Sequence, residues 1–183
     1  MKMLKKLLAV VLTGAMALTL LTACGGNAVT EKGIADAMND MAKATGGDVA
    51  DVTFTPGAKE RELARKIVAL VDSVRANGST DSSTELSAKI DEILGINDGG
   101  VNEKSRYVWV ETALADGIGA AGQAHQIMEG ILSTDAARNK EKLGGKNPAN
   151  DRCMGTALFK GTDLTTGKPV TMRVIVVTAK AEG

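Results

Sequence analysis

Apolar residues recur at helical spacing in two neighbouring stretches of the chain. In the first, over 58–76, the recurring positions are Leu63, Ile67, Leu70, Val71 and Val74. In the second, which ends at Gly95, they are Leu86, Ile90, Ile93 and Leu94. Spacings of three and four residues place side chains on one face of a helix. The pattern predicts two amphipathic helices joined by a short polar turn, the second capped by Ser82.

Two further helices are predicted, one on each side of this pair. The earlier one starts after Thr30, a residue type that caps helix N-termini, and ends at Gly46. Its apolar stripe comprises Ile34, Met38 and Met41. Because this stripe is narrow, we expect the helix to pack loosely. The later helix runs from about 122 to 132, with inward positions Ala124, Ile127, Met128 and Ile131. His125 falls at the margin of that stripe.

Strand patterns dominate the C-terminal part of the chain. Residues 154–160 and 170–178 are rich in apolar side chains and flank a turn-rich stretch at 161–169. A hairpin that is apolar on both faces is expected at the centre of a sheet, covered by helices. An earlier strand is expected where Tyr107, Trp109 and Glu111 alternate with valines. The sequence therefore predicts an α+β fold, with helices packed on an antiparallel sheet and a C-terminal β-hairpin.

The first residues have the layout of an export signal. Lys2, Lys5 and Lys6 are followed by an uncharged stretch, 7–23, and then by Cys24. The segment Leu21-Thr22-Ala23-Cys24 resembles the lipobox of bacterial lipoproteins, which implies cleavage before Cys24 and diacylglyceryl transfer to its thiol. An uncleaved membrane anchor is the alternative, since seventeen helical residues span about 25 Å. We expect residues 1–23 to be a signal peptide, residues 24–57 a lipidated tether with a short helix and linker, and residues 58–183 a single domain.

Cleavage changes both the charge and the cysteine chemistry of the chain. Residues 24–183 contain 19 basic and 22 acidic residues, a formal charge near −3, which argues against a nucleic-acid partner. With Cys24 acylated, Cys153 has no partner for an intramolecular disulfide. It is interpreted as a buried apolar thiol, with a reactive nucleophile or an intermolecular bridge as the alternatives. The predicted location is the outer face of the bacterial cytoplasmic membrane or the cell surface.

Neither a cofactor nor a metal is predicted. The stretch Gly117-Ile118-Gly119-Ala120-Ala121-Gly122 matches the dinucleotide fingerprint in its letters. However, no buried strand precedes it, and no acid ends a second strand at the expected distance. The glycines are therefore interpreted as a turn. One histidine and one free thiol supply only two good zinc ligands, His125 and Cys153.

Several segments, taken in chain order, resemble a known family of extracellular domains. They are Leu70-Val71-Asp72-Ser73-Val74-Arg75, Glu85-Leu86-Ser87, Glu111-Thr112-Ala113-Leu114-Ala115, Ser133-Thr134-Asp135-Ala136-Ala137-Arg138-Asn139 and Met154-Gly155-Thr156-Ala157. This order is similar to that of the CAP family, the SCP-like domains of cysteine-rich secretory and pathogenesis-related proteins. The resemblance implies an α-β-α sandwich with a cleft. The family's cleft histidines have no counterpart here, and only Glu111 matches a cleft acid, so the resemblance implies a degenerate cleft without a metal site.

Three classes of function follow from these observations. The leading hypothesis is a non-enzymatic, membrane-anchored binding module that contacts a cell-wall, lipid or protein partner. Its contact surface is predicted at Tyr107, Trp109 and Glu111, which alternate on one side of a strand; the alternative is that the two aromatic rings cover the core. The second hypothesis is an extracytoplasmic hydrolase-type enzyme that uses Glu111 with His125 or Cys153. The third is a structural subunit of a cell-surface complex, marked by a large exposed apolar patch.

Overall fold

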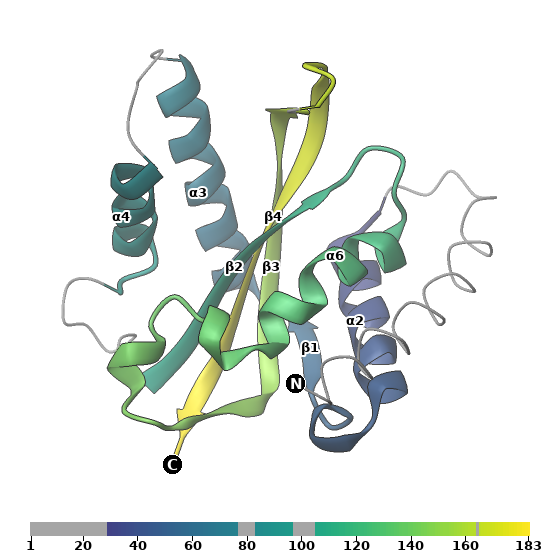
Figure 1. Cartoon of the computed structure of the whole chain (residues 1–183), viewed down its shortest axis with the longest axis vertical. Helices are drawn as coiled ribbons and strands as arrows, with labels where there is room; N and C mark the ends of the chain where they lie inside the picture. The colour runs from purple at the N-terminus through teal and green to yellow at the C-terminus, as the bar shows by residue number, and fades with distance from the viewer. Residues whose placement is uncertain (1–28, 77–82, 97–104, 164) are drawn as a thin grey trace.

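The computed structural model describes residues 29–76, 83–96, 105–163 and 165–183 (Figure 1). The helices in these ranges are α2 (Glu31–Thr45), α3 (Ala58–Ala76), α4 (Ser83–Ile93) and α6 (Ala120–Leu132). The strands are β1 (Thr53–Pro56), β2 (Arg106–Leu114), β3 (Asn147–Thr162) and β4 (Pro169–Glu182). Short 3₁₀ turns are η1 (Gly47–Val49), η2 (Thr134–Ala136) and η3 (Lys140–Leu143). The strands form one sheet in the order β1-β3-β4-β2.

Helices cover both faces of this sheet (Figure 1). Successive side chains of a strand point to opposite faces. In β4, Ile175 and Val177 join the core under α2 and α6, whereas Val174 and Val176 join a second core under α3 and α4. Burial on both faces explains the unbroken apolar run of this strand. The predicted α+β fold and its central, covered C-terminal hairpin are confirmed.

The sheet is mixed rather than wholly antiparallel. β2, β4 and β3 pair antiparallel, and β1 adds a parallel edge beside residues 151–154 of β3. The two hairpin strands are also longer than predicted. β3 continues back to Asn147, through a stretch expected to be a loop because it contains Gly145 and Pro148. Gly145 precedes the strand, and Pro148 lies at a shift in the pairing register that the ladder with β4 tolerates.

The helix pattern is confirmed for α2, α3, α4 and α6, with bounds close to those predicted. The hydroxyl of Thr30 accepts the N–H of Gly33 at 3.0 Å, as an N-cap does. The expectation of loose packing for α2 is wrong, since Ile34 and Met38 are fully buried. The side chains beside the narrow stripe are alanines, so α2 lies close to α6. Small side chains therefore form the interface between these two helices. Ser82, the predicted cap of α4, lies outside the described residues.

The described part of residues 24–57 shares a core with the rest of the chain. Asn39 on α2 accepts the N–H of Phe54 at 2.6 Å and donates to its carbonyl oxygen at 3.1 Å. This side chain therefore stands in for a neighbouring strand along the outer edge of β1. Phe54 itself is buried in the core under α2 and α6. None of the helices in the described ranges has the length and apolarity needed to cross a membrane.

The start of α3 lies directly on the sheet at Gly155. A Cβ atom added to this glycine would come closer than 3.0 Å to the backbone of Arg61, where only a shift of the helix could make room. Two hydrogen bonds hold the helix there. The N–H of Gly57 donates to the carbonyl of Met154 at 2.7 Å, and the hydroxyl of Thr178 donates to the buried carboxylate of Glu60 at 2.7 Å. Gly155 thus fixes the distance between the helix and the sheet.

Candidate functional site

Tyr107 and Trp109 lie inside the core and do not form a contact surface. Tyr107 is 3% exposed and Trp109 is not exposed at all. Their rings stack with centroids 5.3 Å apart, and the indole N–H donates to the carbonyl of Ser133 at 2.9 Å. The two residues do share one side of β2, as their spacing predicts, but α6 covers that side. This corrects the predicted binding surface in favour of the alternative that the rings cover the core.

Arg152 is the charged neighbour of these rings. Its guanidinium carbon lies 4.9 Å from the centroid of the Trp109 ring and 5.9 Å from that of Phe54, within the range of cation–π attraction. One terminal nitrogen donates to the carbonyl of Ile131 at 2.6 Å. Burial lowers the pKa of Arg152 to about 10, because the charged form loses hydration. The aromatic pair therefore serves a buried cation rather than an external partner.

Glu111 lies on the same face of β2 as Tyr107 and Trp109, but it is only partly buried. Its carboxylate occupies the space beside Gly130 on α6, where a Cβ atom would collide with it. Burial raises the pKa of Glu111 above the usual carboxyl value. Among the described residues, no hydrogen bond or ion pair of this carboxylate is found.

The structure separates Glu111 from Cys153, one of the two residue pairs of the enzyme hypothesis. Glu111 faces α6, whereas Cys153, one position before Met154 on β3, points to the opposite face beside Glu60. A sheet therefore separates the carboxylate from the thiol, which excludes direct proton transfer between them. Cys153 is exposed, not buried as predicted. Partial desolvation of its thiol, together with the Glu60 charge, raises the pKa of Cys153, which disfavours the nucleophilic thiolate. Within the described chain, Nδ1 of His125 has no hydrogen-bond partner.

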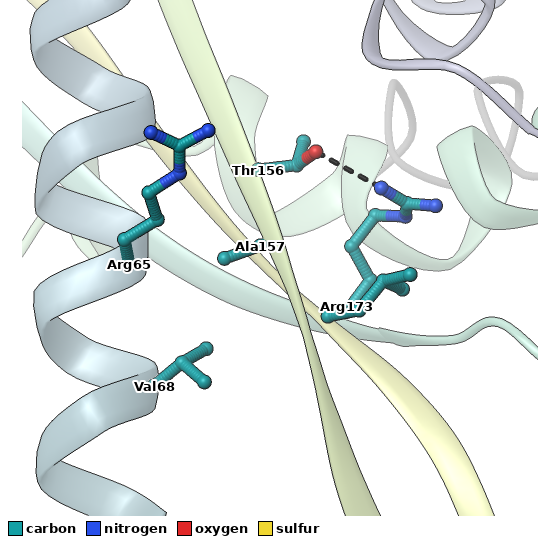
Figure 2. A pocket seen from close by; sticks show the side chains of 6 residues that line it. Arg65, Val68, Thr156, Ala157 and Arg173 are labelled. Carbon is teal, nitrogen blue, oxygen red and sulfur yellow. Dashed lines mark hydrogen bonds between the residues drawn. The ribbon is translucent and has the colours of Figure 1, made fainter.

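A hollow of about 410 Å³ lies beside β3 (Figure 2), beyond the residues of β3 that pair with β1. It is lined by Arg65, Val68, Thr156, Ala157, Leu158 and Arg173. Figure 2 shows Arg65 reaching from α3 on one side of β3, with Arg173 on the other side. Leu158 is 51% exposed, and it is the large apolar side chain that stands out in solvent among the described residues. We call this feature the β3-edge groove.

Arg173 is held in place by neutral oxygen atoms from α6, from β3 and from the segment before α2. Its guanidinium donates to the Gln123 side chain at 2.8 Å, to the Thr156 hydroxyl at 3.0 Å and to the Val29 carbonyl at 3.2 Å. Burial lowers the pKa of Arg173, and the nearby charge of Glu31 opposes that shift. No carboxylate of the described chain forms an ion pair with it. The groove thus contains a rigid cation whose charge is not neutralised by direct contact.

Glu31 covers the edge of β3 at Thr156, next to the groove. Its carboxylate accepts the N–H of Thr156 at 2.8 Å and binds Arg61 through a contact of 2.6 Å. The amide of Thr156 therefore points outward from the sheet, away from β4. Because hydrogen-bonding direction alternates along an antiparallel pair, Leu158 and Lys160 also point their N–H and C=O groups outward. The carbonyl of Lys160 accepts a hydrogen bond from Arg75.

The backbone of Leu158 is open to solvent in the middle of the groove. Neither its N–H nor its carbonyl has a partner among the residues that the structure describes. The edge of β1, by contrast, is covered by Asn39, and the edge of β2 at Val108 is covered by Asn139 and Arg138. Unpaired edge groups of this kind are ready to pair with another extended chain. The β3-edge groove is therefore a place where an additional strand could bind.

The residues predicted as the contact surface lie on β2, whereas the open backbone lies on β3. The open edge follows from the lengths of the two strands. β1 has four residues and β3 has sixteen, so part of β3 has no strand on the β1 side. Predicting this edge from the sequence required knowing that β1 and β3 pair in parallel. No group of three or more potential metal-ligating side chains occurs among the described residues. Cys24, the predicted lipidation site, lies outside them.

Comparisons with protein-family models, with curated proteins and with solved structures found no match. The resemblance to the CAP family accordingly stays a prediction from the sequence. The function proposed below rests on the residues and geometry of this chain.

Proposed function

We propose that this protein is a lipid-anchored, non-enzymatic binding module on the outer face of the bacterial cytoplasmic membrane or at the cell surface. The anchor is the diacylglyceryl group on Cys24, in the sequence Leu21-Thr22-Ala23-Cys24. Two acyl chains give stable attachment, because each buried methylene contributes about 0.8 kcal/mol. The contact surface is the β3-edge groove rather than the aromatic residues of β2.

One observation carries this proposal: the open backbone of Leu158 lies beside an exposed leucine side chain and between two arginines. Soluble domains usually protect an open strand edge with charge or cover it. Here the rest of the β1–β3 edge is covered by Gly57, Glu31 and Arg75, so the gap at Leu158 stands out. A binding module needs such a gap, and a catalytic site at Glu111 does not.

The anchor is tested with the two cysteines of the chain as a matched pair. Cells that express the protein are fed an alkyne fatty acid, and the protein is examined for label and for retention in the membrane fraction. We expect Cys24→Ser to lose both, whereas Cys153→Ser keeps both. Label on the Cys24→Ser protein would contradict the anchor.

The contact surface is tested in living cells by site-specific photo-cross-linking. A photoreactive amino acid is placed at Leu158 and, in a control, at Lys43, which is exposed on α2 away from the groove. We expect adducts from position 158 that are missing from position 43. Equal adducts from both positions, or none from position 158, would refute the groove as the contact surface.

A further inference from the structure

We propose that the β3-edge groove binds an extended, acidic segment of a partner protein, which pairs with β3 as an additional strand. The inference rests on the proposed function, because it names the occupant of the same contact surface. Three properties of the groove support it: its backbone, its charge and its single exposed leucine.

The backbone offers four groups at regular spacing. They are the carbonyl of Thr156, the N–H and carbonyl of Leu158, and the N–H of Lys160, all on the outward side of β3 by the alternation of the ladder. In an antiparallel alignment, one partner residue opposite Leu158 would make two hydrogen bonds, and its neighbours two positions away would make one each. Each such bond contributes about 0.5–1.5 kcal/mol. A short extended segment can therefore bind through its main chain, as in β-strand addition.

The charge of the groove selects an acidic occupant. Arg65 is exposed and forms no hydrogen bond or ion pair with any described residue, so its guanidinium is free to bind a carboxylate. Arg173 contributes a second cation that contacts neutral atoms only. The carboxylate of Glu31, whose charge acts on Arg173, is already engaged by Arg61. A partner carboxylate on the α3 face would thus bind Arg65, and the charge of the buried Arg173 on the opposite face of β3 would attract it from a longer distance.

The leucine sets the pattern of the occupant. By the register of the ladder, Leu158 points to the same face as Met154 and Ile175, which α2 and α6 cover. Arg65 approaches from the face covered by α3 (Figure 2). Side chains of a strand alternate between the two faces. The matching segment therefore alternates apolar residues, which contact Leu158, with acidic residues, which contact Arg65.

A second copy of this chain fits the groove poorly. Two β3 edges paired about Leu158 would bring two copies of Arg65 and of Lys160 to the same edge. Like charges brought together across paired strands are destabilising. An acidic segment neutralises the same charges, which is why it is favoured over self-association.

The test uses the full-length protein in a neutral detergent and a fluorescein-labelled, terminally blocked peptide of sequence Val-Glu-Val-Glu-Val-Glu-Val, followed by anisotropy. The control peptide carries Lys in place of Glu. We expect the acidic peptide to bind and the basic one to bind at least about tenfold more weakly, a difference of about 1.4 kcal/mol. Equal binding of both peptides would overturn the charge argument.

Two substitutions on α3 distinguish binding at Arg65 from a response to the net charge of the protein. Arg65→Glu should weaken the acidic peptide by about tenfold or more, whereas Lys66→Glu, which makes the same change of charge on the adjacent exposed residue, should change its affinity less than about twofold. If both variants weaken binding equally, the peptide senses net charge only, and the proposed site is wrong.

A third substitution removes the backbone donor. Leu158→Pro deletes an N–H that points away from β4, so the β3–β4 ladder stays paired and peptide binding should be lost. If this variant does not fold, amide hydrogen exchange of Leu158 in the native protein replaces it, and the peptide should slow that exchange. Unchanged exchange in the presence of bound peptide, or dimers whose formation the peptide does not reverse, would overturn the proposal. Cross-links from Leu158 in cells without binding of the acidic peptide would refute this inference while leaving the proposed function intact.

Discussion

Gly155→Ala tests how closely α3 is held to the sheet. The added Cβ would come closer than 3.0 Å to the Arg61 backbone, whereas ordinary contact begins at 3.4 Å. The start of α3 therefore has to move outward by about 1 Å or more, since a helix backbone cannot rotate away as a side chain can. Such a shift would lengthen the 2.7 Å bonds Gly57–Met154 and Thr178–Glu60 beyond hydrogen-bonding distance.

The cost follows from these two bonds. Each contributes about 1 kcal/mol, and the buried Glu60 carboxylate that loses its donor adds about 1–3 kcal/mol. The reduced freedom of the unfolded chain offsets about 0.4–1 kcal/mol of this. We expect Gly155→Ala to lower the free energy of unfolding by about 2–4.5 kcal/mol, and the melting temperature by roughly 5–15 °C for a chain of this size.

The assay is urea denaturation of the full-length protein, followed by the fluorescence of the buried Trp109. Gly161→Ala is the matched control in the same strand, because its Cβ would meet the flexible side chain of Met172 at 2.9 Å rather than a backbone. We expect this control to stay within about 1 kcal/mol of the native protein. If the two variants differ by less than about 1 kcal/mol, close contact between α3 and Gly155 does not limit stability.

Two further predictions concern α2 and Glu111. Asn39→Ala removes both hydrogen bonds to Phe54 and should lower the free energy of unfolding by about 2 kcal/mol, measured by the same denaturation; an unchanged midpoint would contradict the role of Asn39 as a strand substitute. Glu111→Gln should stabilise the protein near neutral pH, by less than about 1 kcal/mol because Glu111 is partly exposed. Burial raises the pKa of Glu111 in the folded state, so its penalty is present above that pKa and disappears as the pH falls below the unfolded value. Denaturation at about pH 7 and about pH 4 should show the advantage of Gln at the higher pH only, and an equal advantage at both would refute the burial argument.

The fold was largely predictable because its elements carry strong local patterns. The stripe of α3 and the alternating strand of Tyr107 and Trp109 both form as expected. The candidate site was not predictable, because it arises from a difference in length between β1 and β3, which pair in parallel across about a hundred residues of sequence. Period-two spacing places Trp109 on one side of its strand but does not tell which side a later helix will cover. In this fold, α6 covers the side of β2 that carries Trp109.

Under the proposed acylation of Cys24, the hydrogen bond between Arg173 and the Val29 carbonyl would limit how far the β3-edge groove can lie from the membrane. Only four residues separate Val29 from Cys24, so a fully extended connection reaches at most about 18 Å. With Cys24 acylated, the β3-edge groove lies within one protein-domain radius of the lipid headgroups. A partner segment must then enter this narrow layer next to the membrane. On that proposal, the lipid anchor contributes to binding specificity, because segments held far from the bilayer do not reach the β3-edge groove.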